Sequence, residues 1–471
     1  MSDSKQGNTI AREEVENLCR INGEPTWLKD NRLAGWEAYL QCPMPTGKTE
    51  DWRTTIVDTL DLSELTAVEP IAKATKEIAL ELLTSAKANL GDLAGVYVED
   101  YATGSKSHNV DKALTDKGVV FAPLKTALEQ HSDVLKGLIT TERAGLKDKF
   151  TLMNQALWTD GLYLRVPKNT TIDLPFVFMV NLPVKAKEAA AKAEGAADSE
   201  AEKFGQAVFP KVILVAEENS KVNFVTMIGS QESAQAEGQI TLANAAIELH
   251  LAAGANVSVA EVSNMGEEVF LVNRIKAFIG KDATLDYTTA GLGAKQIKAD
   301  IETILTAPGA TARVNGVVLG DSDEHFAYNT IADHTATDTN SNIVFRVALK
   351  DESTSIYQGI IKVEKIAQRT DSYQSNKNLL LGTEARADSI PKLEILADDV
   401  KCSHGATVGP VDKEQLFYLN SRGLTLIQAE EMIVTGFFQQ VLDTIPITGV
   451  AQWMSKLVAD KIRGTKAEAS D

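Results

Sequence analysis

The sequence predicts a mainly β protein with helical segments at both ends. Two observations lead to this prediction. Short segments rich in β-branched residues fill the chain between about residues 160 and 400, and helical periodicity occurs before and after them. We therefore expect an N-terminal mostly helical domain over 1–150, a β core over 151–410 and a C-terminal helical domain over 411–471.

The N-terminal region has apolar residues at helical spacing, including Trp27, Trp36 and Leu40. A turn-like stretch with two prolines follows at 42–47. The segment 71–90 is rich in Ala, Leu, Glu and Lys, which are good helix formers. These patterns predict at least two helices in this region.

An insert at 185–203 consists largely of Ala, Glu and Lys and has almost no large apolar residue to bury. It lies between two expected strands, at 176–180 and 212–215. We interpret it as a surface excursion between these strands. A helix that binds a partner is a weaker alternative.

The middle region repeats one pattern, in which a short turn precedes each strand-like segment. The segments are 221–225, 257–262, 283–287, 312–317 and 355–359, and the turns are Asn219-Ser220, Gly254-Ala255, Asp282-Ala283, Gly309-Ala310 and Glu352-Ser353. The turns recur at intervals of roughly 27 to 43 residues, as stacked coils of a β-solenoid would. An ordinary β-sandwich with similar turn chemistry fits this irregular spacing equally well.

The last region returns to helical periodicity after Asp412. Thr425 and Gln428 have the spacing of a capping box. One face of the helix that follows is formed by residues at three- and four-residue steps: Ala429, Met432, Ile433, Gly436, Phe437 and Val441. A second helix is expected over 451–462. The face either packs within the chain or docks another chain.

Composition narrows the class of function. The 471 residues include 47 Lys and Arg against 65 Asp and Glu, a formal net charge of −18, which argues against nucleic acid or an anionic membrane as a partner. No signal peptide or membrane-spanning stretch is apparent. Three cysteines, Cys19, Cys42 and Cys402, do not make a disulfide framework. We expect a cytoplasmic protein.

No motif for nucleotide hydrolysis, hydride transfer or acyl transfer is complete. The segments 42–49, 291–296 and 320–324 each fail a position that a phosphate loop, a dinucleotide fingerprint or a nucleophile elbow requires. We therefore expect no catalytic machinery of this kind in the chain.

One short element carries chemistry. Cys402 and His404 are two residues apart, so on a strand their side chains would point to the same side and could touch one metal ion or one sulfur atom. The acidic pair Asp398-Asp399 just upstream would oppose thiolate formation. A buried structural cysteine beside a hydrogen-bonded histidine is the bland alternative.

The number of ligands adds a constraint. An iron–sulfur cluster usually needs four thiolates, some of which histidine can replace. Cys402 and His404 cannot complete that set, and Cys19 and Cys42 lie far away in the sequence. If the pair holds a metal ion or a cluster, a second polypeptide must supply the missing ligands.

The region around this element resembles a known family. The run 391–409, which includes Lys401-Cys402-Ser403-His404-Gly405-Ala406-Thr407, is similar to the signature of the SufB/SufD family, and the resemblance continues through 414–423 and 429–437. It is closer to the SufD branch, because SufB-type chains usually have an acidic residue and no cysteine before the corresponding histidine. The N-terminal segments 25–28 and 50–54 also look SufD-like.

The resemblance implies a right-handed parallel β-helix core between helical domains. It also implies a scaffold subunit of iron–sulfur cluster assembly that pairs with a SufB-type chain and leaves ATP hydrolysis to an ABC-type ATPase, SufC. Cys402 and His404 would hold iron or a nascent cluster transiently, shared with SufB. Ala429, Met432, Ile433, Gly436 and Phe437 would help to dock SufC. A homodimer of the isolated chain is left open.

Two other functions remain as alternatives. The chain could brace SufB and recruit SufC without touching iron or cluster. It could also be a β-helix enzyme that acts on polysaccharide, for which Asp321, Asp323 and Glu324 are the only dense group of carboxylates. A solvated turn explains these three residues more simply.

Overall fold

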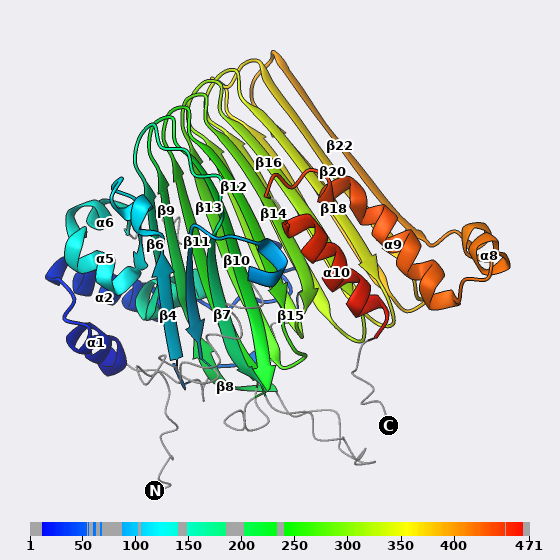
Figure 1. Ribbon diagram of the computed structural model, residues 1–471, viewed down its shortest axis with the longest axis horizontal. Helices are drawn as coiled ribbons and strands as arrows, with labels where there is room; N and C mark the ends of the chain where they lie inside the picture. The colour runs from blue at the N-terminus through cyan, green and yellow to red at the C-terminus, as the bar shows by residue number, and fades with distance from the viewer. Residues whose placement is uncertain are drawn as a thin grey trace, which may run out of the picture.

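The computed structural model describes residues 12–53, 55, 60–62, 66–67, 87–101, 105–139, 148–184, 202–232, 240–447 and 449–464. These residues form a β-solenoid of about six turns with helices toward both ends of the chain, which confirms the predicted fold class (Figure 1). The helix predicted within 71–90 lies mostly outside the described residues, and so does most of the insert at 185–203.

Two sheets form the solenoid, and consecutive strands alternate between them from β9 to β22. We call them the N-sheet and the C-sheet, after the terminal helices that cover each. The N-sheet contains, in spatial order, β21 (Arg386–Ile395), β19 (Thr354–Val363), β17 (His325–His334), β15 (Gln296–Leu305), β13 (Val269–Ile279), β11 (Ile240–Leu251), β9 (Pro210–Ala216), β6 (Asp160–Val166) and β5 (Val120–Pro123). A side branch of this sheet starts at β8 (Glu202–Val208), which pairs with β11 and with the short strands β1 (Leu60–Asp61) and β2 (Thr66–Ala67).

The C-sheet lies opposite the N-sheet across the interior of the solenoid. It contains, in spatial order, β22 (Val400–Pro410), β20 (Thr370–Leu380), β18 (Asn340–Leu349), β16 (Thr311–Gly320), β14 (Thr284–Gly293), β12 (Asn256–Asn264), β10 (Lys221–Glu232), β7 (Phe176–Val184), β3 (Gly95–Asp100) and β4 (Ser105–Val110). Strands β3, β4 and β5 fall within the region 1–150, where the sequence predicts mostly helix. The predicted division into three domains stays a prediction.

Helices cover the outer faces of both sheets. The helices before the solenoid are α1 (Arg12–Ile21), α2 (Thr26–Gln41), the 3₁₀ turn η1 (Glu50–Trp52), α4 (Lys112–Thr115), α5 (Leu124–Gln130), α6 (Ser132–Leu138) and α7 (Lys149–Leu157). Those after it are α8 (Lys413–Ser421), α9 (Leu426–Leu442) and α10 (Val450–Ile462). The predicted capping box at Thr425 and Gln428 is present at the start of α9.

One corner of each coil is formed by a residue in the left-handed conformation. Asn219, Gly254, Asp282 and Gly309 all have positive φ, between 53° and 78°. The Asp282 N–H donates to Pro308 O at 3.0 Å in the next coil, and the Gly309 N–H donates to Asp338 O at 3.0 Å. Asn, Asp and Gly adopt this conformation most readily, so the turn residues predicted from the sequence fix the corners.

The fifth predicted turn, at 352–353, belongs to the opposite corner. It follows Asp351, which also has positive φ, and it leads into β19 of the N-sheet, whereas the other four turns lead into strands of the C-sheet. This change of corner explains the longest interval in the sequence. From β12 onward the repeat within the C-sheet is nearly constant: Asn256 pairs with Thr284, Thr284 with Thr311, and Thr311 with Asn340. The step before it, from Lys221 to Asn256, is longer.

Three apolar clusters hold these layers together. The largest lies inside the solenoid and includes Phe224, Leu285 and Phe345. The second lies between the N-terminal helices and the outer face of the N-sheet, and the third lies between α9, α10 and the outer face of the C-sheet. Both sheets are therefore buried on their two faces along most of their length, as is usual for parallel strands.

The two ends of the solenoid differ. At the N-terminal end, β4 and β5 add antiparallel to β3 and β6 and cover the edges of the first coil. At the C-terminal end, β21 and β22 are the last strands of their sheets among the described residues. Their outer edges carry backbone groups that a further strand could pair with.

Replacing a corner glycine should destabilise the coil. Gly309 has a φ of +78°, and an added Cβ would lie 2.0 Å from Asp282 Oδ1. We expect Gly309→Ala to lower the free energy of unfolding by about 1–3 kcal/mol, because an L-residue is strained in this conformation. Thermal and urea unfolding measure the effect.

The matched control is Gly436→Ala in α9, where no atom lies within 4 Å of an added Cβ. This change should be neutral or stabilising by up to about 1 kcal/mol, because alanine favours helix over glycine. Equal midpoints for the two variants would show that the corner conformation does not contribute to stability.

Candidate functional site

Cys402 and His404 lie on β22, the last strand of the C-sheet. Cys402 pairs in register with Ser372, and His404 pairs with Gln374 on β20. Ser372 and Gln374 are both 1% exposed and point into the solenoid. Because side chains alternate along a strand, Cys402 and His404 share that inward side. The structure thus places the two residues on one face, as their spacing predicts.

No further coil of the described chain covers the two side chains, and they differ in exposure. Cys402 is partly buried against a small cluster at this end of the solenoid that includes Ile361 and Val363. His404 is exposed, although its partner Gln374 is buried. The pair is therefore open to whatever faces the end of the solenoid, and it is not sealed within the chain.

The surroundings of Cys402 favour its neutral thiol over the thiolate. Burial raises the pKa of Cys402 above its ordinary value, and the carboxylate of Asp371 on the neighbouring strand raises it further. The sequence points instead to Asp398 and Asp399 as the opposing charges. Asp371, which is close to Cys402 in space, raises the pKa of the thiol, and Asp398 and Asp399, which are close in sequence, are not among the causes.

A thiol and an imidazole on one face can bind a soft or borderline metal ion, or a sulfur atom. Among the described residues there is no group of three or more His, Cys, Asp or Glu side chains that could hold a metal ion. Cys19 is buried among the N-terminal helices, and Cys42 lies at the end of α2, on the far side of the N-sheet. The structure does not bring either of them to Cys402.

The sequence analysis missed a set of polar residues that lines the same end. On β20 the inward positions are Ser372, Gln374, Asn376 and Asn378, all at most 5% exposed. Gln374 Oε1, Asn376 Nδ2 and Asn378 Oδ1 have no hydrogen-bond partner within the described part of the chain. The signal in the sequence is a polar residue at every second position from 372 to 378, although the sequence analysis did not predict a strand there.

Apolar side chains are also exposed at this end. Leu393 and Ile395 on β21 lie in register with the fully buried Ile361 and Val363, yet they are 37% and 38% exposed. Val408 on β22 is 47% exposed. Side chains that the solenoid buries in earlier coils are therefore open to solvent in the last coil, which is typical of an interaction surface.

The predicted docking stripe on α9 is divided between two roles. Ala429 is fully buried against the chain's own core, because the face of α9 that carries it packs on the C-sheet. Phe437 is partly buried and packs against the same cluster, and Ile433 is of intermediate exposure. Met432 is 54% exposed and Gly436 is also exposed. Ala429 therefore cannot contact a partner, whereas Met432 can.

The sequence analysis also missed the exposed residues of α8. No residue of this helix is buried, and Phe417 and Tyr418 are 75% and 56% exposed. Leu426 and Ile427, in the first turn of α9, are 53% and 46% exposed. Figure 1 shows α8 projecting beyond the last strands of the solenoid. Helix periodicity alone does not reveal α8, because its apolar residues do not form a stripe.

The carboxylates considered for polysaccharide chemistry have another role. Glu324 is 4% exposed and accepts a hydrogen bond from Lys461 Nζ of α10 at 2.6 Å. Asp321 also lies 3.2 Å from Lys461 Nζ. These two carboxylates anchor α10 at a corner of the solenoid and do not form an open pair on one of its faces.

No helix among the described residues combines the length and the apolar character needed to span a membrane.

Comparison with known proteins gives consistent matches. The family model of the SufBD protein N-terminal region matches residues 16–177, and that of the SUF system FeS cluster assembly, SufBD core domain, matches residues 197–437. The iron–sulfur cluster assembly protein SufD of Bacillus subtilis is 27% identical over 97% of this chain and 98% of its own. An iron–sulfur cluster assembly SufBD family protein of Staphylococcus saprophyticus is 25% identical over 96% of this chain and 92% of its own.

Removing the charge next to Cys402 should make its thiol more reactive. We expect Asp371→Asn to lower the pKa of Cys402 and to speed its alkylation at neutral pH by about two- to fivefold, the size of a partly screened charge interaction. Iodoacetamide labelling followed by peptide mass spectrometry measures the rate. Asp388→Asn on β21, whose carboxylate pairs with Arg386, is the control. Equal rates in the two variants would contradict the assignment of Asp371.

Proposed function

Because the chain belongs to the SufBD family of iron–sulfur cluster assembly proteins, we propose that it is a SufD-type scaffold subunit. It pairs with a SufB-type chain and recruits a SufC-type ABC ATPase, and it has no catalytic step of its own. Iron or a nascent cluster is its transient cargo, shared with the SufB-type chain.

One observation carries this proposal: Cys402 and His404 lie together at the open end of the solenoid with an incomplete set of ligands. Cys402 is partly buried and His404 is exposed, both on the last strand of the C-sheet. A facing chain can supply the remaining ligands across this end. Cys402 then serves as thiolate ligand or sulfur acceptor, and His404 serves as iron ligand or proton acceptor.

The raised pKa of Cys402 implies that binding of the cargo is coupled to the loss of a proton. Burial, with Asp371, favours the thiol, so Cys402 must lose a proton when it binds iron or sulfur. His404, two residues away on the same face, is the closest histidine along the strand and can take that proton. Cargo binding therefore requires either proton release or a change in the surroundings of Cys402.

The same end is suited to a SufB-type partner. The edges of β21 and β22 can pair with further strands, and the exposed Leu393, Ile395 and Val408 provide apolar area to bury. Such an interface would enclose Cys402 and His404. ATP hydrolysis by SufC would rearrange the interface and open the enclosed ligands.

The exposed side chains of α8 and the start of α9 favour this region as the docking surface for SufC. We call Phe417, Tyr418, Leu426, Ile427 and Met432 the α8–α9 patch. All five are between 46% and 75% exposed, and they lie on two helices that follow each other along the chain. Clustered apolar and aromatic side chains of this kind are common at the centre of protein interfaces.

A structural brace that ligates nothing is the second candidate. The raised pKa of Cys402 favours it, because a protonated thiol is a poor ligand. The brace uses the same apolar end and the same α8–α9 patch. The two candidates differ only in whether Cys402 and His404 are needed for function.

Removing the two candidate ligands tests the scaffold proposal. In cells that depend on this pathway, we expect Cys402→Ala and His404→Ala to reduce cluster delivery by at least about tenfold, because neither ligand has a substitute among the described residues. Activity of a cluster-dependent reporter enzyme measures delivery. Ser403→Ala, between the two residues on β22, is the matched control and should behave like the wild type. Normal cluster delivery by both test variants would contradict the scaffold proposal and leave the structural brace as the remaining candidate function.

Charge in the α8–α9 patch tests recruitment of the ATPase. We expect Phe417→Asp and Met432→Asp each to weaken SufC binding by about tenfold or more, because an interface would bury the new charge. Copurification and titration calorimetry measure the binding. Ile366→Asp is the control, since Ile366 is 68% exposed in the turn between β19 and β20, away from these helices. Unchanged SufC binding by both test variants would exclude the patch as the docking surface.

A further inference from the structure

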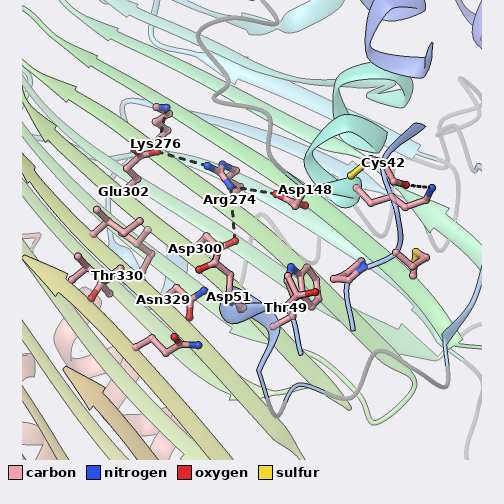
Figure 2. Close-up of a pocket in the computed structure, with 18 of the residues that line it drawn as sticks. Cys42, Thr49, Asp51, Asp148, Arg274, Lys276, Asp300, Glu302, Asn329 and Thr330 are labelled. Atoms are coloured by element: carbon pink, nitrogen blue, oxygen red, sulfur yellow. Dashed lines mark hydrogen bonds and ion pairs between the residues drawn. The ribbon is translucent and has the colours of Figure 1, made fainter. Parts of the chain in front are cut away.

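A cleft lies on the outer face of the N-sheet, beneath the segment 42–52 and the start of α7. Its main chamber has a volume of about 400 Å³, and a narrower recess of about 40 Å³ lies beside it. Both are lined by Asp148, Arg274, Lys276 and Asp300, so they adjoin each other. Figure 2 shows residues that line the main chamber. The cleft is separate from the Cys402 end, and the proposed function does not use it.

The floor of the recess follows from the register of the sheet. Lys211 on β9 pairs with Ala246 on β11, and Ala246 pairs with Arg274 on β13. The backbones of Lys211 and Arg274 are therefore roughly 10 Å apart, two strand spacings. The methyl group of Ala246 fills little of the space between the two long side chains. The recess is the gap above Ala246, with a cation on each side.

Lys211 is the unusual member of this row. Its side chain lines the recess, the residue is only 6% exposed, and its Nζ makes no hydrogen bond or ion pair with any other described residue. Burial lowers its pKa, although the negative charge of Glu248 partly offsets this effect. A buried ammonium without a partner is costly, and an anion in the recess would remove that cost.

Helix α7 forms the roof of the recess and is fixed in place. Asn154 Nδ2 donates to Asn244 O at 2.7 Å, and Asn244 Nδ2 donates to Phe150 O at 2.7 Å, which joins α7 to β11. Gln155, the next residue of α7, also lines the recess and is 3% exposed. Its Nε2 has no hydrogen-bond partner among the residues that the structure describes. The roof thus adds a second buried donor that lacks an acceptor.

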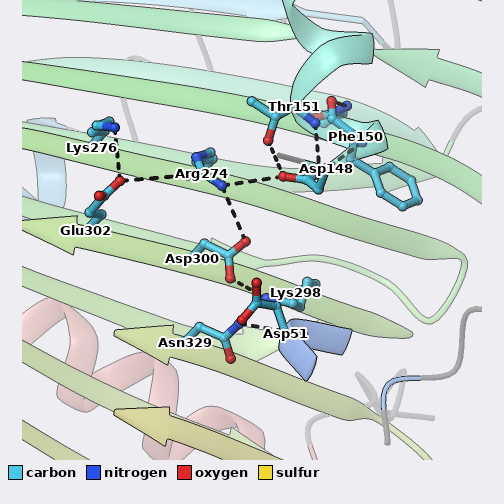
Figure 3. A network of polar contacts seen from close by, with 11 residues as sticks. Asp51, Asp148, Phe150, Thr151, Arg274, Lys276, Lys298, Asp300, Glu302 and Asn329 are labelled. Atoms are coloured by element: carbon cyan, nitrogen blue, oxygen red, sulfur yellow. Dashed lines mark hydrogen bonds and ion pairs between the residues drawn. The ribbon is translucent and has the colours of Figure 1, made fainter. Parts of the chain in front are cut away.

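Arg274 lies between the recess and the main chamber, among three carboxylates (Figure 3). Its Nη1 is 3.4 Å from Asp148 Oδ2 and 4.0 Å from Asp300 Oδ2, and its Nη2 is 3.7 Å from Glu302 Oε2. These separations exceed the 2.7–2.9 Å of a tight charge-assisted hydrogen bond. Arg274 Nε is buried and has no hydrogen-bond partner in the described part of the chain. Arg274 can therefore bind another acceptor without leaving its neighbours.

We propose that the recess above Ala246 binds the carboxylate of a small organic acid, with Lys211, Gln155 and Arg274 as the donors. Three unsatisfied donors around one small space match the two acceptor oxygens of a carboxylate. Asp148, Glu248 and Asp300 also line the recess, and they would repel a dianionic phosphate more strongly than a singly charged carboxylate. The site therefore favours a monoanion over a dianion.

The main chamber defines the rest of the ligand. Its walls include the apolar side chains of Met44, Pro45, Trp52, Ile331 and Ile360. Its volume is in the range of small-molecule sites, which use apolar walls and a few polar groups to orient the ligand. The ligand is accordingly a short carboxylic acid with an aliphatic or aromatic body.

Binding of simple acids to the full-length chain tests this site. The probes are butyrate and phenylbutyrate, with butyramide as the neutral counterpart and inorganic phosphate as the other anion. We expect ligand-observed NMR and calorimetry to detect both carboxylates. Butyramide should bind at least about tenfold more weakly, because it lacks the charge that strengthens the hydrogen bonds to the donors. Phosphate should also bind at least about tenfold more weakly, because the carboxylates of the recess repel a dianion more strongly.

Two variants locate the binding. Lys211→Met should weaken carboxylate binding about tenfold or more, and Ala246→Leu should abolish it by filling the recess. Lys211→Met should also keep or raise the melting temperature, because it removes an unpaired buried charge, so lost binding cannot be attributed to unfolding. Lys221→Met is the control, since Lys221 is half-exposed and pairs with Asp173. Cys402→Ala should bind the acids normally.

Three outcomes would overturn the proposal. The first is that neither carboxylate binds. The second is that butyramide or phosphate binds as tightly as butyrate. The third is that the Lys211→Met and Ala246→Leu variants bind butyrate with the affinity of the wild type. Each outcome would show that the unsatisfied donors of the recess do not select a carboxylate.

Discussion

A parallel solenoid depends on one constraint: each coil satisfies its backbone hydrogen bonds through the coil before it and the coil after it. The first coil and the last coil each lack one neighbour. At the first coil this chain supplies antiparallel strands, β4 and β5, which cover the edges. At the last coil the described residues supply no such strand, and β21 and β22 remain as edges. The open end, and with it the position of Cys402 and His404, follows from this asymmetry.

The interior of the solenoid changes character toward the open end. On β18 the inward residues Ile343, Phe345 and Val347 are apolar, whereas the residues in register with them on β20 are Gln374, Asn376 and Asn378. Apolar burial stabilises the earlier coils, while the last coils hold amide groups whose hydrogen-bonding capacity is not filled. The last coils are therefore less well stabilised and have a polar end, which suits the cargo exchange and partner binding proposed for this surface.

Much of the fold could be predicted from the sequence, because corner residues and strand alternation are local features. Asn219 and Asp282 marked the left-handed corners, and the two-residue step placed Cys402 and His404 on one face. Register and stacking are not local. For this reason the sequence could not show that Asp371, rather than Asp398, lies next to Cys402, or that Ala429 packs against the C-sheet. The recess above Ala246 depends on pairing across three strands and left no motif to recognise.

The connection between β22 and the C-terminal helices links the two exposed surfaces. β22 ends at Pro410 and α8 begins at Lys413, so the strand that carries Cys402 continues almost directly into the α8–α9 patch. Helix α9 is fixed to earlier coils, since Arg346 Nη2 on β18 donates to Gln440 Oε1 at 3.1 Å and Phe438 is fully buried. A partner that moves α8 relative to α9 would therefore pull on β22, which is held on one side only, and would leave the earlier coils in place. The proposed recruitment of an ATPase to this patch would in this way be connected to access to Cys402 through a single edge strand.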